Sequence, residues 1–202
     1  PTTSSAASDV YKRQPLYHSD LFVKENVGTD EQISDLKKQI LDARDNDRGT
    51  QPGSNEGCWR SNALYEMQWL YDEMKQLVIN ANKIYFDKDP VFKNFIDNSD
   101  TLDYNIWTNV NEVGSSNVIH SHKPDAWSGI YYIQAEGTGN LMFTNPANIL
   151  SDCNTKSPFT RKTGIQPKDG MLVLWPAWVP HEVIENKSSK QRINIAWGLN
   201  FK

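Results

Sequence analysis

The first half of the chain combines polar loops with segments in which apolar residues recur at helical spacing. Thr29-Asp30-Glu31-Gln32 has the form of a capping box, in which side chains satisfy the free N–H groups at the start of a helix. The apolar positions that follow at helical spacing are Ile33, Leu36, Ile40 and Leu41. The pattern therefore predicts a helix that begins directly after Thr29.

Four further elements are predicted before residue 100. They are a strand over 15–23, a polar and glycine-containing loop over 45–57, a long helix over 61–86 and a short helix over 90–96. The apolar face of the long helix comprises Leu64, Met67, Leu70, Tyr71, Met74, Leu77, Val78, Ala81 and Ile84. A methionine and aromatic stripe at this spacing indicates core packing.

The second half of the chain has a different pattern, with short β-branched and aromatic segments separated by Gly, Asn, Asp and Pro. The predicted strands are 102–110, 117–122, 127–134, 140–144, 171–175, 181–185 and 192–201. Regular short strands of this kind favour an antiparallel sandwich or barrel. We expect the helices of the first half to pack outside this β core, and the connection 145–168 to act as a lid or substrate loop.

Composition narrows the class of protein. A chain of 202 residues with 23% charged residues suits one soluble domain. The net charge of −4 comes with no basic stripe, which argues against nucleic-acid binding. No apolar run is long enough to span a membrane, and Cys58 and Cys153 are interpreted as reduced thiols, so we expect a cytoplasmic location.

The first 14 residues are excluded from the fold prediction. Asp9-Val10-Tyr11-Lys12-Arg13-Gln14 resembles the translation of a transposon end used in sequencing libraries. Residues 1–14 are therefore interpreted as a non-native or disordered tail; a natural Ser/Thr/Ala-rich tail would also be disordered. We expect residues 15–202 to form a single domain, with helical support over about 15–100 and the β core over about 101–202.

The histidines carry the strongest chemical signal. In a strand, His120 and His122 of His120-Ser121-His122 would point to one face, and a fold-back after Pro180 would bring His181 to them. Three ligands on one side of an ion leave the other positions open, which is typical of a catalytic metal site. Neutral imidazole suits iron, zinc, copper and nickel. We favour His120, His122 and His181 as the ligand set, with Asp125 as an alternative carboxylate ligand.

Arg192 adds a second chemical group to this pattern. It opens the alternating segment Arg192-Ile193-Asn194-Ile195-Ala196-Trp197, eleven residues after His181. Arg192 and Asn194 would share the inward face of a barrel strand, where a guanidinium can hold a carboxylate through two parallel hydrogen bonds. We therefore expect Arg192 to bind a ligand.

The order of these motifs resembles a known family. The motifs are Asn117-Val118-Ile119-His120-Ser121-His122, Trp127-Ser128-Gly129-Ile130-Tyr131-Tyr132-Ile133, Gly139-Asn140-Leu141-Met142-Phe143-Thr144-Asn145-Pro146, Gly170-Met171-Leu172-Val173-Leu174-Trp175-Pro176, His181, and 192–201. Over about 102–201, this order is similar to the 2-oxoglutarate and iron(II)-dependent oxygenases of the type found in phages and marine bacteria.

The resemblance implies a fold, cofactors and roles for several residues. It implies a mainly β, jelly-roll or cupin-like double-stranded β-helix with iron(II) at one mouth, and 2-oxoglutarate and O₂ as cosubstrates of a hydroxylase. His181 would be the distal iron ligand and Arg192 the partner of the 2-oxoglutarate C5 carboxylate. Asn194 stands where relatives carry a small hydroxyl residue, and Tyr104 and Tyr132 would line the cosubstrate pocket. The departure is His122, which occupies the usual carboxylate position.

Two other classes of function stay open from the sequence. Gly114 with His120-Ser121-His122, and Gly170 with Pro176 and His181, match much of the two cupin motifs. A cupin-type dioxygenase or isomerase would bind metal without 2-oxoglutarate, and a non-catalytic barrel would only bind a ligand. In each case the substrate or ligand would be a small molecule or a peptide. The candidate pocket walls are Trp107, Trp127, Trp175 and Trp178.

Overall fold

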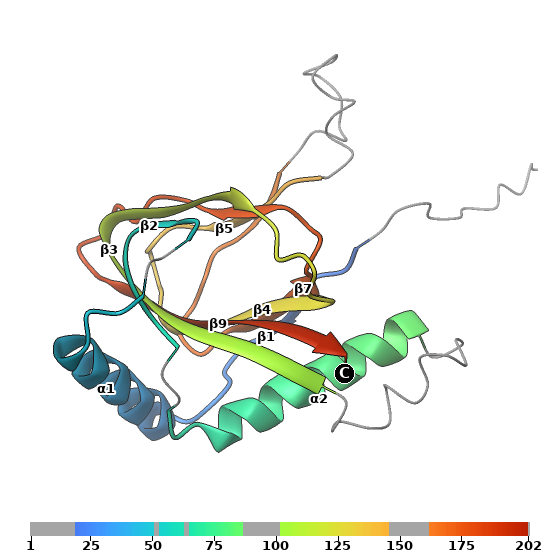
Figure 1. Cartoon of the computed structure of the whole chain (residues 1–202), viewed down its shortest axis with the longest axis horizontal. Helices are drawn as coiled ribbons and strands as arrows, with labels where there is room; N and C mark the ends of the chain where they lie inside the picture. Colours follow the sequence, from blue (N-terminus) through green and yellow to red (C-terminus); the bar gives the residue numbers. More distant parts are fainter. Residues whose placement is uncertain (1–18, 51–52, 63–64, 87–101, 146–161, 202) are drawn as a thin grey trace, which may run out of the picture.

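The chain folds into a curled β-sheet with two helices packed along one side (Figure 1). This computed structural model describes residues 19–50, 53–62, 65–86, 102–145 and 162–201. The helices are α1 (Asp30–Asn46) and α2 (Gln68–Phe86). The strands are β1 (Phe22–Lys24), β2 (Asn55–Ser61), β3 (Leu102–His120), β4 (Trp127–Gln134), β5 (Leu141–Phe143), β6 (Thr163–Ile165), β7 (Leu172–Pro176), β8 (His181–Val183) and β9 (Arg192–Phe201).

Strand β3 links the two layers of the sheet. The strand order is β1-β7-β4-β9-β3-β8-β5-β6, with β2 on β3, and the strand pairs of the described residues are antiparallel. The first part of β3 pairs with β9 up to Asn111, whereas Asn117 and His120 pair with β8. Because one strand belongs to both layers, the sheet curls around an interior. This arrangement confirms the predicted double-stranded β-helix with helices outside.

Strand β9 shows how the alternation of its side chains separates the two faces of its layer of the sheet. Ile193, Ile195 and Trp197 are fully buried in the cluster that also contains residues of both helices. The alternate residues of β9, beginning with Arg192 and Asn194, line the cavity inside the barrel. The period of two residues therefore places an apolar face on the helices and a partly polar face in the interior.

The two helices follow the predicted pattern. The Thr29 hydroxyl accepts a hydrogen bond from the Gln32 N–H at 3.2 Å, and the Gln32 side chain accepts one from the Thr29 N–H at 2.8 Å. This confirms the capping box. Leu36 and Ile40 of α1 are buried, and so is most of the described apolar stripe of α2. The prediction is wrong for Ile84, which is 66% exposed near the end of α2.

Several predicted boundaries are wrong because pairing between distant segments decides them. Strand β2 lies where the sequence predicted the end of a loop and the start of a helix, so α2 begins only at Gln68. Its residues pair with β3, from Asn55 opposite Asn117 to Ser61 opposite Thr108. The same pairing joins the predicted strands 102–110 and 117–122 into one strand. Strand β6 forms inside the predicted connection 145–168 by pairing with β5.

Some predictions lie outside the described residues: the tail 1–14, part of the first predicted strand, the helix 90–96, most of the connection 145–168, Leu64 and Cys153. Among the residues that are described, neither helix has the length and apolar character needed to cross a membrane.

We predict that Gly129→Ala lowers the free energy of unfolding by about 1–3 kcal/mol, because a Cβ there would overlap the indole ring of Trp197, which is fully buried. Denaturant titration measures the change. The control is Gly164→Ala, where the new Cβ meets the flexible end of the Met142 side chain. Equal losses in the two variants would contradict this account of the core.

Candidate metal and cosubstrate site

Three histidines meet in the lining of the cavity inside the barrel. His120 of β3 lies directly opposite His181 of β8 in the antiparallel register, so both side chains leave the same face of the sheet. His122 follows two residues after His120, just beyond the end of β3, where its backbone N–H donates to the Ala177 carbonyl at 3.0 Å. Residues from two distant segments therefore supply the cluster that the sequence predicted.

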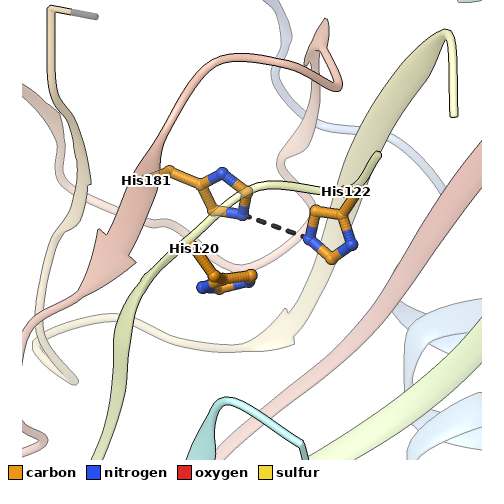
Figure 2. Close-up of side chains that lie close together, drawn as sticks. All are labelled: His120, His122 and His181. Carbon is orange, nitrogen blue, oxygen red and sulfur yellow. Dashed lines mark hydrogen bonds between the residues drawn. The ribbon is translucent and has the colours of Figure 1, made fainter. Parts of the chain in front are cut away.

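The three imidazoles lie close together, and a nitrogen of His122 faces a nitrogen of His181 (Figure 2). One nitrogen from each ring lies within 4.8 Å of those of the other two rings. The Nε2 atoms of His122 and His181 are 3.2 Å apart. Two nitrogens bound at about 2.1 Å and at right angles to one metal ion are about 3 Å apart. The donor set and its spacing therefore fit a divalent metal such as iron(II).

Backbone carbonyls fix which nitrogen faces the metal position. The Nδ1 atom of His181 is 3.0 Å from the Val179 carbonyl oxygen, and that of His120 is 2.7 Å from the Val118 carbonyl oxygen. A carbonyl oxygen only accepts, so each Nδ1 carries the hydrogen and donates it. In the neutral ring this leaves the lone pair on Nε2, the atom that binds a metal.

Burial keeps the histidines neutral. It lowers the pKa of His181 to about 3 and that of His122 to about 4. Charge repulsion from His120 lowers both values further, and that from Arg60 lowers the pKa of His122. The pKa of His120 is lowered by burial as well. Apolar rings surround the cluster: the centroid of Trp175 lies 4.9 Å from that of His181, and that of Trp107 lies 5.4 Å from that of His122. Neutral imidazole is the form that binds a metal ion.

Arg192 lies deeper in the same cavity, and one arm of its guanidinium has no partner. The residue is 1% exposed, and its Nη1 donates to the Thr138 carbonyl oxygen at 2.7 Å. Its Nη2 is buried without a hydrogen-bond partner. Burial lowers the pKa of Arg192, but an arginine stays charged at neutral pH. A buried cation with a free donor suits an anionic ligand.

Asn194 joins a row of asparagine amides along the cavity wall. Its Oδ1 accepts from Asn109 at 2.9 Å, and its Nδ2 donates to the Asn111 Oδ1 at 3.4 Å. Asn111 in turn donates to Asn55 at 2.6 Å. The row crosses β3, β9 and β2, and its four members line the cavity. It gives the interior wall polar groups with fixed orientations.

The structure brings only some of the other predicted residues to the cavity. Trp107 and Trp175 line it, and Tyr132 is fully buried in the interior cluster with an unpartnered hydroxyl group. Tyr104 and Trp127 lie on the opposite face of their strands, toward the helices. Tyr104 packs against Trp197, and the Trp127 indole donates to Asn82 of α2 at 2.8 Å. Their positions in the strand alternation make them core residues.

Trp178 and Asp125 also lie away from the cavity. Trp178 is 42% exposed in the turn before β8. Asp125 packs against Gly198 of β9, where its Oδ1 accepts from the Asn200 amide at 3.0 Å. It does not belong to the group of side chains whose donor atoms converge. The arrangement favours the three-histidine ligand set over the carboxylate alternative.

Comparison with known proteins agrees with this geometry. Residues 105–198 match the model of a family described as "Putative 2OG-Fe(II) oxygenase". Comparison with curated protein sequences found no match. The similar solved structures include a prolyl-4-hydroxylase from Pseudomonas putida, with a TM-score of 0.62 and 14% identity over 90% of this chain and 92% of that one.

Two further solved structures have the same fold. A prolyl hydroxylase from Trichoplax adhaerens, in complex with a hypoxia inducible factor peptide fragment, gives a TM-score of 0.61 and 12% identity over 89% of this chain and 82% of that one. HygX from Streptomyces hygroscopicus, with nickel and 2-oxoglutarate bound, gives a TM-score of 0.57 and 10% identity over 91% of this chain and 84% of that one. At these identities the similarity establishes the double-stranded β-helix.

The family match over the barrel and the three-histidine cluster decide the activity class. The chain is an iron(II)- and 2-oxoglutarate-dependent oxygenase. The predicted class of enzyme and its cofactors are thereby confirmed.

Sequence reasoning missed several residues that line the cavity of the oxygenase. They are Arg60, Asn55, Asn109, Asn111 and the more exposed Ser54 and Asn117. The alternation Asn109-Val110-Asn111 resembles that of β9 and could have indicated a second inward polar strand. Arg60 carried no such signal, because it lies between the predicted loop 45–57 and the predicted helix 61–86, where no strand was predicted.

We predict that the metal-free oxygenase loses stability on acidification below pH 6.5. His181 resists protonation in the folded state but binds a proton at its ordinary pKa, near 6.5, when unfolded, so low pH favours unfolding. The loss for this residue is about 1.4 kcal/mol at pH 5.5. Denaturant titrations with a chelator at pH 7.5, 6.5 and 5.5 measure it. His181→Gln should reduce the pH dependence, and an unchanged dependence would contradict the prediction.

Proposed function

We propose that this oxygenase holds iron(II) through His120, His122 and His181, and binds the C5 carboxylate of 2-oxoglutarate at Arg192. The observation that carries the proposal is the unpartnered Nη2 of Arg192, which is buried in the cavity that the three histidines also line. Leaving a buried donor of a charged group without a partner is costly, and a ligand carboxylate removes that cost.

The chain's own residues prepare the site for oxidation of a C–H bond. When bound, iron(II) supplies the ability to activate O₂ with 2-oxoglutarate as the source of electrons. The carbonyl groups of Val118 and Val179 orient the rings of His120 and His181. Trp175 is 3% exposed. Together with Phe143, it excludes water from one side of His181. Arg192 fixes the far end of the cosubstrate, and so its orientation.

The reaction we propose is hydroxylation of a small molecule or a peptide side chain. The structural neighbours support this range, because one is a prolyl hydroxylase in complex with a peptide and another is HygX with hygromycin B bound. The order of the barrel motifs further supports assignment to the phage and marine-bacterial type, with a phage or metagenomic source. We also propose a cytoplasmic location, which agrees with the need for a reduced metal.

We predict that His120→Ala, His122→Ala and His181→Ala each weaken iron(II) binding by about tenfold or more, because each removes one donor atom. Anaerobic calorimetry with the metal alone measures the affinities. Asp125→Asn is the matched control and should stay within about twofold of the unsubstituted protein. If Asp125→Asn weakened binding as much as the histidine variants, the ligand set would contain this carboxylate.

We predict that Arg192→Gln raises the 2-oxoglutarate concentration needed for half-maximal turnover by about 10–100-fold. This factor corresponds to the free energy of a charge-assisted hydrogen-bonded pair. The measurement is succinate formation from 2-oxoglutarate with iron(II) in the absence of another substrate. Arg48→Gln, which removes the charge of an exposed arginine, is the control. The same proteins are titrated anaerobically for the visible charge-transfer band, and absence of the band in the unsubstituted protein would refute the proposed function.

A further inference from the structure

A second guanidinium lines the cavity and is not used by the proposed cosubstrate site. Arg60 lies on β2, in a row of paired residues that continues to Asn109 of β3 and Asn194 of β9. Because side chains along such a row share a face, Arg60 points to the interior beside the asparagine wall. It occupies the part of the cavity next to the histidines, since Arg60 and His122 both lie against the Trp107 ring.

The described contacts of Arg60 leave its Nε donor free. Its guanidinium carbon lies 4.8 Å from the centroid of the Trp107 ring, a cation–π contact, and that ring is in turn 5.4 Å from His122. Its Nε is buried without a hydrogen-bond partner. Among the ion pairs found in the described residues, none includes Arg60. Trp107 therefore contacts the guanidinium but does not neutralise its charge.

The cavity as a whole has an excess of positive charge. Its described lining contains the cations Arg60 and Arg192 and three neutral histidines, and contains no aspartate or glutamate. The nearby Cys58 does not provide an anion, because burial raises the pKa of its thiol to about 11. With histidine in place of the usual carboxylate ligand, a bound metal adds positive charge that no side chain of the described lining balances. The dianion 2-oxoglutarate offsets the metal and Arg192 only in part.

Uncompensated positive charge in a partly buried cavity favours an anionic ligand. We propose that Arg60 binds an oxyanion, a carboxylate or a phosphate, of the molecule that the oxygenase hydroxylates. The inference rests on the proposed function, since it assigns Arg192 to 2-oxoglutarate and leaves Arg60 for the second substrate. The contact with Trp107 holds the guanidinium in the cavity, where its planar group can form a paired hydrogen bond to the anion. The substrate class is therefore an organic acid or phosphate ester.

The test uses three probes with the same ring and different head groups: benzoate, phenyl phosphate and neutral benzamide. Each is titrated by calorimetry into the full chain, loaded anaerobically with iron(II) and 2-oxoglutarate. We expect benzoate or phenyl phosphate to bind, and benzamide to bind at least tenfold more weakly or not at all. Arg60→Gln should weaken the anion by at least tenfold. The relative affinity of the two anions distinguishes a carboxylate from a phosphate as the recognised group.

Two variants serve as controls for charge and for folding. Arg48→Gln makes the same charge change at an exposed position outside the cavity and should bind the anion as the unsubstituted protein does. Arg60→Lys keeps the charge but lacks the planar guanidinium that donates two parallel hydrogen bonds. It should bind the anion more weakly than the unsubstituted protein and more tightly than Arg60→Gln. Thermal unfolding checks that the Arg60 variants are folded. If Arg60→Gln does not fold, Arg60→Lys alone decides whether Arg60 binds the anion.

The inference is overturned if neither anion binds the loaded protein, if benzamide binds as tightly as the anions, or if the Arg60 variants bind the anions within twofold of the unsubstituted protein. Failure of the proposed function gives a different result, because iron(II) and 2-oxoglutarate then produce no charge-transfer band. In that case the same titrations of the metal-free chain still show whether Arg60 binds an anion.

Discussion

The register between β3 and β8 is the constraint on which the site depends. It sets His120 opposite His181 and thereby joins two parts of the chain that are 61 positions apart in the sequence. A slip by one residue would turn one of these rings to the other face of the sheet and leave no metal site. The long strand β3 makes this register possible, because it pairs with β9 in one layer and with β8 in the other.

Electrostatics follow from the same arrangement. Three neutral imidazoles grouped in an apolar surrounding bind a metal without adding negative charge, and the strand alternation that buries the apolar face of β9 under the helices places Arg192 in the interior. The described cavity thus contains cations and neutral amides but no acid. Its chemistry selects anions, first the cosubstrate and then, through Arg60, the molecule to be oxidised.

The sequence predicted the elements whose signals are local. The capping box at Thr29, the alternation of β9 and the His120-Ser121-His122 pair each depend on neighbouring residues, and each was found. Elements that depend on distant pairing were not predicted. Strand β2 has no clear alternation of its own and forms because β3 offers an edge. For that reason Arg60 escaped prediction. Trp127, which the alternation sends to the helices, was predicted as a pocket wall.

The most direct test of the central claim is a crystal structure of the oxygenase grown anaerobically with iron(II) and 2-oxoglutarate. We expect one iron ion bound by nitrogen atoms of His120, His122 and His181, with the C5 carboxylate of 2-oxoglutarate on Nη2 of Arg192. An iron ion ligated by Asp125, or a cosubstrate whose carboxylate lies away from Arg192, would contradict it.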